Sequence, residues 1–597
     1  MQEFNSGYQQ CLGVVNSFNG YAWRQARIDD DAVLSIKARC KIDDFLARIL
    51  AGRGFNADMA LAFIEPSFKA LMPDPSTILD VDVAVSRIIS AIEKNEKIAI
   101  FGDYDVDGAT SSALLIRFFK ALGIDADVYI PDRIKEGYGP NIKAMLGLYE
   151  KGISLVITVD CGITSFEPLE AAMKAGLDVI VFDHHKAQPN LPKAIAVVNP
   201  NRSDDYSGQG HLAAVGVTFL VLVALNRALR KLNWYALNVV KEPNLSQWLD
   251  LVALGTVCDV VPLTGLNRAY VRNGLVALAK HNNVGLRALS KVTRMDEPVR
   301  SFHLGYILGP RVNAGGRVGD SSIGVRLLSS DDPNESSILS QRLEDYNTNR
   351  KEVETAVLLQ SIEEADTQIT ADSNFVFVCG DHWHPGVIGI VASRLKERFN
   401  LPAFVLSKEG SVAKGSGRSI HGIDIGAAIS AARDAGLLVN GGGHVMAAGF
   451  TVEIELLDNF KTFLDKFIGE QRKGVGLISS IDVDSVLSLN ALTLNLSNKL
   501  QVLEPFGAAN PEPRVAIPSV QVIKPKIVGA GHISFIMIGD SASSIKAIAF
   551  NAVDSSLGFA ILDSQKSFFN FLGYLRENNW QGRKSVQFVV SDGVLAD

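Results

Sequence analysis

The sequence contains few cysteines, and they form no metal-binding or disulfide pattern. Five cysteines are scattered over 597 residues, and no two of them stand in a CxxC pair. Neither a zinc knuckle nor a disulfide framework is therefore supported. Cys161 and Cys258 each stand beside an aspartate discussed below. For both, the simpler interpretation is a small buried hydrophobic residue.

Long hydrophobic runs are also missing. The longest apolar run covers residues 212–225, which is shorter than the roughly 20 residues that a helix needs to cross a bilayer. We expect a buried helix there and no membrane association. No hydrophobic leader core follows Met1, and this favours a cytoplasmic protein.

The chain has no excess of positive charge. Its formal net charge is −7, which argues against a protein that grips duplex DNA through a generally basic surface. A local basic cleft is still possible, because metal ions also attract phosphate. Global charge therefore says little about a nucleic-acid substrate.

Strands and helices alternate regularly after Lys97. At 597 residues the chain should hold more than one domain. Short apolar runs separated by helices that end at glycine predict right-handed crossovers and a parallel sheet. The strands expected are 97–104, 125–131, 154–160, 178–183 and 194–200, and the intervening helices are 110–122, 141–149 and 166–175.

The remaining segments differ in pattern. Residues 334–369 contain neither Gly nor Pro and keep a helical apolar spacing, which predicts a long connecting helix. Short alternating runs near the end of the chain predict a small β-barrel or sandwich. We therefore predict an α/β protein with these parts: a helical segment 1–85, a parallel-sheet domain 86–332, a connecting helix 333–371, a smaller α/β domain 372–473 and a β domain 474–597.

Aspartates recur where the predicted strands end. Asp103, Asp105 and Asp107 lie together in FGDYDVDGA, and single aspartates follow in TVDCG, VFDHHK and LGTVCDVVP. Carboxylates spaced i, i+2, i+4 repel one another unless a cation or protons compensate. We also expect Gly108 to allow a sharp turn before the helix that starts at Thr110. The pattern indicates a divalent-metal site that acts on phosphate esters.

Simpler interpretations exist for each motif. An aspartate after a strand is often only a helix N-cap, and DHH could be a capped turn with one buried histidine. The DxDxDG string is also similar to a calcium loop, but Leu114 stands where that loop needs glutamate, and a strand precedes it. Carboxylates mixed with imidazoles suit Mn²⁺ or Mg²⁺ better than zinc.

Taken together, these segments resemble the motifs of the DHH phosphoesterase superfamily. GDHWHPGVIGIVASRLKERF, GSGRSIHGIDI and GGGHVMAAGF resemble its DHHA1 companion domain. LGPRVNAGGRVGD and the chain length are similar to the RecJ family of single-strand-specific exonucleases. The resemblance implies that the metal ligands are Asp105, Asp107, Asp160, His184 and Asp259, with Asp103 and His185 as ligands or their supports. Two ions about 3.5–4 Å apart would activate water and stabilise the leaving oxygen, and we expect Asp160 to bridge them.

The predicted second domain and its neighbours supply groups that could bind phosphate. Glycine-rich turns at GSGRS and GGGH combine accessible backbone amides with Ser416, Arg418 and His444. The resemblance adds Arg133 and Arg311 as contacts to the strand, although surface salt bridges are the alternative. His384, with Trp383, would stack on or bond to the nucleotide, or pack the helix entry. In the β domain, Phe506, Lys524 and Lys526 would face single-stranded DNA.

The resemblance implies a cytoplasmic, metal-dependent 5′→3′ exonuclease that cuts single-stranded DNA to 5′-mononucleotides. It would act in recombination and repair, as a monomer, beside single-strand-binding protein and a helicase. One alternative is a phosphodiesterase of short oligonucleotides or cyclic dinucleotides. Another is a catalytically silent DNA-binding scaffold.

Overall fold

The chain folds into two structural units. The computed structural model describes residues 7–295, 298–370, 372–473, 480–539, 543–564, 567–580 and 583–596. One unit comprises Met1–Met72, Pro262–Ala269 and Leu477–Asp597, and the other comprises Pro73–Val261 and Tyr270–Gly476. Among the described helices, none combines the length and apolarity that spanning a bilayer requires.

The larger unit contains a five-stranded parallel sheet with strand order β4-β3-β5-β6-β7. Its central strands are buried along their whole length, which explains why they read as continuous apolar runs. This confirms the predicted α/β fold with a parallel sheet. The strands are β3 (Ile98–Gly102), β4 (Asp127–Tyr129), β5 (Leu155–Val159), β6 (Asp178–Phe182) and β7 (Ala196–Val198).

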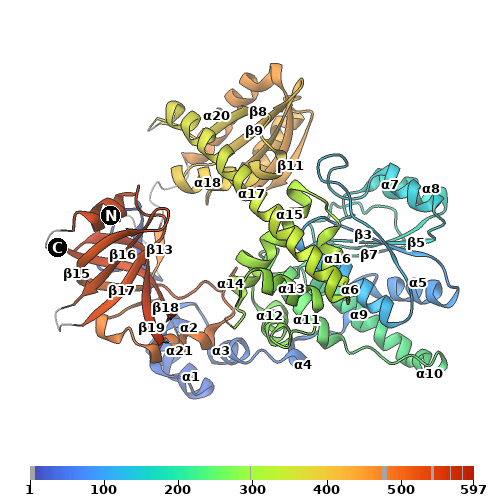
Figure 1. Cartoon of the computed structure of the whole chain (residues 1–597), viewed down its shortest axis with the longest axis horizontal. Coiled ribbons are helices and arrows are strands. Elements are labelled where there is room, and N and C mark those ends of the chain that lie inside the picture. Colours follow the sequence, from blue (N-terminus) through green and yellow to red (C-terminus); the bar gives the residue numbers. More distant parts are fainter. Residues whose placement is uncertain are drawn as a thin grey trace. The chain divides into compact units, whose positions relative to one another are not determined.

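Helices cover both faces of this sheet (Figure 1). Helices α7 (Ile142–Glu150) and α8 (Phe166–Ala175) pack on one face in a common apolar core. Three further helices lie outside this core and also contact strands of the sheet: α5 (Val81–Glu93), α6 (Val106–Ala121) and α9 (Ala214–Lys231). Helix α8 ends at Gly176, which adopts the left-handed conformation that stops a helix. The apolar run 212–225 lies largely in the buried helix α9, as predicted.

Further helices complete the domain around the sheet. They are α10 (Trp234–Leu237), α11 (Leu249–Cys258), α12 (Gly265–Leu278), α13 (Val284–Val292), α14 (Ser301–His303), α15 (Gly309–Val318) and α16 (Ile323–Ser329). The first residues of α12, up to Ala269, belong to the smaller unit. The predicted long helix is confirmed as α17 (Pro333–Gln368). It begins at the N-cap Asp332 with proline at the first helical position.

A second, mixed sheet follows α17, with strand order β11-β12-β10-β9-β8. Its strands are β8 (Val376–Asp381), β9 (Ala403–Glu409), β10 (Val412–Arg418), β11 (Asn440–His444) and β12 (Ala447–Glu453). Helix α18 (Pro385–Phe399) packs with α17 on one face. Helices α19 (Ile425–Asp434) and α20 (Leu457–Arg472) share a phenylalanine-rich core with the other face. The boundary that we predicted at 473/474 adjoins 474–479, which lie outside the described residues.

The smaller unit contains the predicted β-barrel. Strands β15, β16, β17, β19 and β18 pair in that order, and a further pairing of β15 with β18 closes the ring. The strands are β15 (Val515–Val528), β16 (His532–Ile538), β17 (Ser544–Ala549), β18 (Phe568–Trp580) and β19 (Arg583–Leu595). Strand β18 is absent from our sequence prediction. Phe506 packs against the core of this unit, so it is not simply a surface residue.

The prediction of a purely helical N-terminal segment is wrong at its start. Strands β1 (Tyr8–Gln10) and β2 (Ala22–Ala26) precede the helices α1 (Asp30–Cys40), α2 (Asp44–Gly52), α3 (Ala57–Ile64) and α4 (Phe68–Leu71). Strand β2 pairs in parallel with β13 (Ser480–Asp482), far away in the sequence. A local pattern cannot reveal a partner at that distance. Residues of the first three helices join the barrel residues in one apolar core.

Candidate metal centre and substrate site

Three aspartates follow neighbouring strands at one edge of the parallel sheet. The register pairs the last residues of β3, β5 and β6 with one another. The next residues are Asp103, Asp160 and Asp183. Asp160 leaves its strand with a φ of 60°, a left-handed conformation that aspartate tolerates better than most residues. Ligands bind at this carboxyl edge in open α/β sheets.

Two further aspartates stand at the start of α6. Asp105 is the N-cap, and its Oδ1 accepts a hydrogen bond from the Gly108 amide at 3.0 Å, while Asp107 lies in the first turn. The helix thus begins one turn earlier than the predicted Thr110, and Gly108 lies inside it. Glycine is needed there for space, because a β-carbon would lie 2.4 Å from the carbonyl oxygen of Asp103. The predicted sharp turn at Gly108 is wrong.

Asp107 also holds the start of α9. Its Oδ2 accepts from the Ala214 amide at 2.6 Å, and its Oδ1 accepts from the Val215 amide at 2.9 Å. Helix α9 has no side-chain cap of its own, so Asp107 supplies one from a distant part of the chain. The N-cap interpretation is therefore partly correct for Asp107, but the helix that it caps is α9 and not α6, to which it belongs.

Asp259 reaches the same place from a helix. We predicted a strand end, but Asp259 is the C-cap of α11. The apolar run before it is a buried helix, which periodicity alone cannot distinguish from a buried strand. The next residue, Val260, has a φ of 60°, an outlying conformation for a β-branched residue. Strain of this kind concentrates at functional sites.

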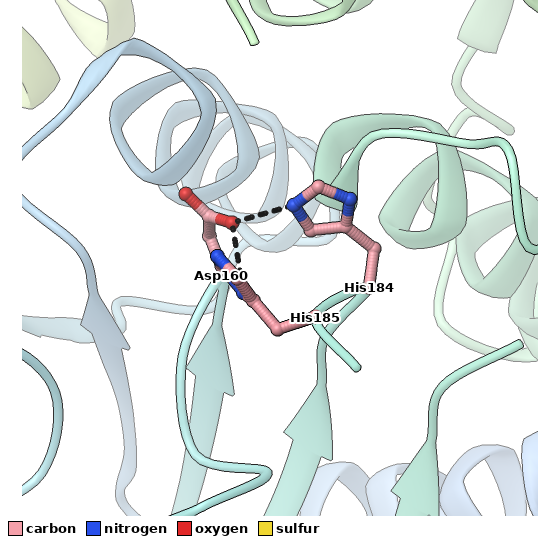
Figure 2. Close-up of side chains that lie close together, drawn as sticks. All are labelled: Asp160, His184 and His185. Carbon is pink, nitrogen blue, oxygen red and sulfur yellow. Dashed lines mark ion pairs between the residues drawn. The ribbon is translucent and has the colours of Figure 1, made fainter. Parts of the chain in front are cut away.

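His184 lies between these carboxylates. Its Nε2 is 3.4 Å from Asp160 Oδ1, 3.5 Å from Asp259 Oδ2 and 4.0 Å from Asp107 Oδ2. His185 approaches the same oxygen of Asp160, with its Nδ1 3.9 Å away (Figure 2). Ligand atoms within 4.8 Å of one another form three overlapping groups: Asp103, Asp105 and Asp160; Asp107, His184 and Asp259; and Asp160, His184 and His185.

Several buried polar atoms of this cluster lack hydrogen-bond partners among the described residues. They are Asp103 Oδ1, Asp160 Oδ1, His184 Nε2 and Asp259 Oδ2. Each unsatisfied buried group costs about 1–3 kcal/mol, so a concentration of them requires an explanation. Divalent cations would supply the missing partners, and carboxylate oxygens with an imidazole suit Mn²⁺ or Mg²⁺. The cluster therefore fits a divalent-metal site.

The electrostatics of the cluster lead to the same conclusion. Burial, together with the charge of Asp105, raises the pKa of Asp107 to about 7 and the pKa of Asp160 well above its usual range. Burial and Asp107 raise the pKa of Asp259 to about 9. Burial and the neighbouring His185 lower the pKa of His184 to about 4. Without cations the site thus disfavours ionised carboxylates and favours a neutral imidazole.

Asp183 has a different environment. Its Oδ2 accepts from the Ile163 amide, and its Oδ1 accepts from the amides of His184 and His185. The Oδ1 also lies 2.7 Å from His185 Nδ1. Although burial opposes it, these interactions lower the pKa of Asp183, led by the bond from His185. Asp183 therefore orients the two histidines and has no oxygen left without a partner.

Tyr138 closes one side of His185. Its hydroxyl donates to the backbone oxygen of Asp160 at 2.9 Å and lies 3.3 Å from His185 Nδ1. Burial disfavours the charged ring of His185, but the bond to Asp183 outweighs it and raises the pKa of His185 to about 9. The predicted ligands and their neighbours thus converge at one point, with Asp183 and Tyr138 as supports that the sequence prediction did not assign.

An arginine cluster lies near the metal centre. Arg418 donates to Ser416 Oγ at 3.0 Å, and burial together with Arg133 lowers its pKa. Arg317 donates to the Gly386 carbonyl at 3.0 Å, and burial, Arg133 and Arg350 lower its pKa to about 10. Buried guanidinium groups whose pKa is lowered by neighbouring positive charge are typical of an anion site.

Arg317 is the residue of this cluster that sequence reasoning missed. It stands six positions after Arg311 in LGPRVNAGGRVGD, and both residues belong to α15. Of these two arginines, we predicted only Arg311 to bind the strand. The structure places Arg311 in an ion pair with Glu344 and in a hydrogen bond to the Ile307 carbonyl, which is the salt-bridge alternative. If the motif had been predicted to be a helix, its periodicity would have placed the two arginines on different faces of that helix.

The glycine-rich segments are strands and not the turns that we predicted. GSGR ends β10, and GGGH forms most of β11. A β-carbon at Gly415 would lie 2.2 Å from the ring of Phe450, and one at Gly417 would lie 2.9 Å from the ring of Phe404. These glycines therefore make room for core aromatics. Alternation along β10 leaves Ser416 and Arg418 on the other face.

Two histidines of this region each use one ring nitrogen for the backbone. His384 is the N-cap of α18, and its Nδ1 accepts from the Gly386 amide at 3.1 Å. His444 Nδ1 accepts from the Met446 amide at 3.3 Å. The Nε2 atoms remain for a ligand. Trp383 is buried, and its indole donates to Gln360 Oε1 at 2.7 Å, so packing accounts for it.

Comparison with known families agrees with this architecture. Residues 97–256 match the DHH family, N-terminal domain; residues 372–470 match the DHHA1 domain; and residues 483–592 match the RecJ OB domain. The first two matches contain the metal cluster up to His185 and the β10–β11 segments. The third contains the closed barrel.

Similar proteins cover most of the chain. A single-stranded-DNA-specific exonuclease RecJ of Bacillus subtilis is 34% identical over 96% of this chain and 71% of its own length. The RecJ of Escherichia coli is 33% identical over 95% of this chain and 98% of its own length. A crystal structure of RecJ with Mn²⁺ from Thermus thermophilus superposes with a TM-score of 0.78. It is 28% identical, and the match covers 95% of this chain and 78% of that one.

Proposed function

The chain belongs to the RecJ family of single-stranded-DNA-specific exonucleases, and we propose that it removes 5′-mononucleotides from the 5′ end of single-stranded DNA with the help of divalent metal ions. One observation carries this proposal. Buried carboxylate and imidazole atoms that have no hydrogen-bond partner within the described part of the chain converge at the carboxyl edge of the sheet. Such a site gains its function only with cations and an anionic substrate.

Two of the three ligand groups have no member in common, and the third, Asp160, His184 and His185, overlaps both. Asp103 and Asp105 would hold one ion together with Asp160, and Asp107 and Asp259 would hold another together with His184. Asp160 and His184 each belong to two of the three groups. Of these two residues only Asp160 offers two oxygens, so we propose Asp160 as the bridge. Mn²⁺ or Mg²⁺ bound here would activate water for in-line attack on phosphorus and stabilise the leaving oxygen.

His185 is held for a task on the substrate. Its Nδ1 faces the Asp183 carboxylate at 2.7 Å, so the ring is fixed and Nε2 remains available. A ring that gains a proton in this environment donates a charge-assisted hydrogen bond to a phosphate oxygen. We propose this role for His185. Orienting an ion in the group that it shares with Asp160 and His184 is the alternative.

The arginine cluster supplies the second half of the site. Arg418 and Ser416 on β10, with Arg133 and Arg317, would bind phosphates of the strand because bidentate guanidinium groups suit phosphate oxygens. His384 and His444 would add their Nε2 atoms. Arg311 is committed to Glu344, and we assign it to the support of α15 against α17.

Two alternative functions could be built on the same fold. A phosphodiesterase of short oligonucleotides or cyclic dinucleotides would use the same centre, but the closed barrel adds a nucleic-acid-binding fold that favours long strands. A catalytically silent scaffold would not need the partnerless ligand atoms. By family relation we also expect a monomer that acts in the cytoplasm beside single-strand-binding protein and a helicase.

Digestion of end-labelled DNA tests the proposal. Single strands labelled at either end and a matched duplex are incubated with Mn²⁺, with Mg²⁺ and with chelator. We expect mononucleotides, loss of the 5′ label first, resistance of blunt duplex, and no cleavage in chelator. Hydrolysis of dinucleotides to tetranucleotides alone would favour the first alternative, and absence of metal binding by calorimetry would favour the second.

A further inference from the structure

A pair of aromatic side chains is exposed on the segment that follows α13. Tyr306 is 73% exposed and Phe302 is 49% exposed. Their rings stack on each other with centroids 5.0 Å apart and planes inclined by 24°. Single exposed apolar residues are ordinary, but an exposed stack of two large rings on one face suggests a binding surface. We refer to Phe302 and Tyr306 as the aromatic pair.

The backbone that carries the pair is unusual. Phe302 belongs to α14, and Tyr306 lies in the π-helical turn η3 (Leu304–Leu308) that continues it. π-Helical turns are rare and occur frequently at functional sites. Gly305, between the two aromatic positions, would place a β-carbon 3.4 Å from Val257 Cγ1. The turn is therefore packed closely on α11.

This packing ties the aromatic pair to the metal centre. The Cys258 thiol donates to the Leu304 carbonyl at 3.5 Å, and a β-carbon at Gly309 would lie 2.4 Å from Cys258 Sγ. The next residue after Cys258 is Asp259, whose Oδ2 is 3.5 Å from His184 Nε2. Tyr306 is two residues after Leu304, and two residues span at most about 7 Å of backbone. Tyr306 therefore lies within a few nucleotides' length of the metal centre.

We infer that the aromatic pair is a stacking platform for a base of the single strand whose phosphodiester bond occupies the metal centre. The inference rests on the proposed function and specifies how that site holds its substrate. Every base has a π-face, so a stack of this kind binds strands without sequence preference. A base already paired and stacked in a duplex cannot lie on the rings, so the platform also favours single strands.

Two substrates separate stacking from chemistry. One is a single-stranded oligonucleotide, and the other is thymidine 5′-(p-nitrophenyl phosphate), which has no second base to stack. We expect Tyr306→Ala to lower kcat/KM for the oligonucleotide about 10- to 100-fold, mainly through KM, and to leave the small substrate unaffected. Tyr306→Phe and Tyr306→Trp keep a ring and should restore the oligonucleotide activity.

Tyr149→Ala is the matched control. Tyr149 is 46% exposed, and it lies near the C-terminal end of α7, which a right-handed crossover places away from the carboxyl edge. Both substrates should react as with the wild type. Equal losses of Tyr306→Ala on both substrates, or no loss on either, would overturn the inference.

An oligonucleotide with one abasic position, moved along the strand, supplies a second test. Removing the base that stacks should weaken binding to the wild type at one position and have no further effect on Tyr306→Ala. Binding is measured in Ca²⁺ by fluorescence of 2-aminopurine strands, which are quenched on stacking. This measurement needs no cleavage, so failure of the exonuclease proposal remains distinguishable from failure of the platform. A uniform response to all abasic positions would contradict the platform.

Discussion

Gly255 on α11 lies directly against Asp107 on α6. A β-carbon at Gly255 would stand 3.0 Å from Asp107 Oδ1 and 2.3 Å from the Thr110 hydroxyl. Gly255→Ala should therefore displace the carboxylate and weaken metal binding at least tenfold without removing a ligand. Calorimetric titration with Mn²⁺ measures this change.

Gly147→Ala is the control for that substitution. Gly147 lies in α7 with no atom within 4 Å of the added β-carbon. Alanine is a better helix former than glycine by about 1 kcal/mol, so this variant should be slightly more stable and bind metal normally. Normal metal affinity in Gly255→Ala would contradict the tight fit at α11.

Asp160→Ala should abolish nuclease activity, with a loss of at least a hundredfold, and should preserve the fold. The reason is that Asp160 contributes to two ligand groups a buried oxygen that has no hydrogen-bond partner among the residues that the structure describes. Its removal also relieves repulsion among buried carboxylates, so the chelated variant should melt no lower than the wild type. Activity on labelled single strands and calorimetric melting check both statements.

Asp250→Asn is the comparison for a buried carboxylate outside the cluster. Asp250 is 1% exposed, and burial raises its pKa to about 6. Neutralising it leaves the metal ligands intact, so activity should stay near that of the wild type. If Asp160→Ala and Asp250→Asn lose activity equally, the cause would be the loss of a buried carboxylate and not the loss of a metal ligand.

The chelated protein should lose stability as pH rises from about 6.5 to 9. In the folded state the pKa of Asp259 is raised to about 9 by burial and Asp107, and that of Asp160 is raised by burial and Asp105. The folded form holds these protons longer than the unfolded chain, so the stabilisation present at low pH is lost as pH climbs through the folded pKa. His185, raised to about 9, acts in the same direction.

His184 does not contribute to the loss of stability between about pH 6.5 and 9. Its pKa is lowered to about 4 by burial and His185, so its contribution is lost only as pH falls below about 6.5. Melting temperatures in chelator should fall across the window, and saturating Mg²⁺ should remove most of the fall because cations replace the protons. Asp259→Asn should flatten the profile in chelator. A flat profile for the wild type would show that folding does not raise the pKa of these carboxylates.

Arg418→Ala should weaken binding of single-stranded DNA more than it disturbs metal binding. Its guanidinium is oriented by Ser416 and lies among other arginines, so its loss removes a phosphate contact of about 1–3 kcal/mol. Arg433→Ala removes an exposed arginine that is paired with Asp434 in the same domain and should change neither. Fluorescence anisotropy and calorimetry separate the two effects. Equal loss of DNA and metal binding in Arg418→Ala would indicate a structural role.

The sheet and the cluster could be predicted because the relevant signals are local. A strand, a following aspartate and a glycine-terminated helix occupy adjacent positions in the chain, and parallel pairing aligns their ends. Asp259 shows the limit. We predicted a helix over 245–254 but a strand end at Asp259, whereas the helix α11 continues to Cys258 and packs against α6 and α9.

Residues that depend on distant partners were less predictable. Glu344 determines the role of Arg311, and Phe404 and Phe450 determine the glycines of β10. Strand β2 needs β13 from the far end of the chain. None of these partners shares a sequence window with the residue that it explains.

The residues of the cluster are spread along the chain from Asp103 to Asp259. Asp259, the last of them in the sequence, lies beside His184. During synthesis on the ribosome, a nascent chain that stops short of that point cannot hold both cations. Nuclease activity should therefore be absent from polypeptides that end before Asp259.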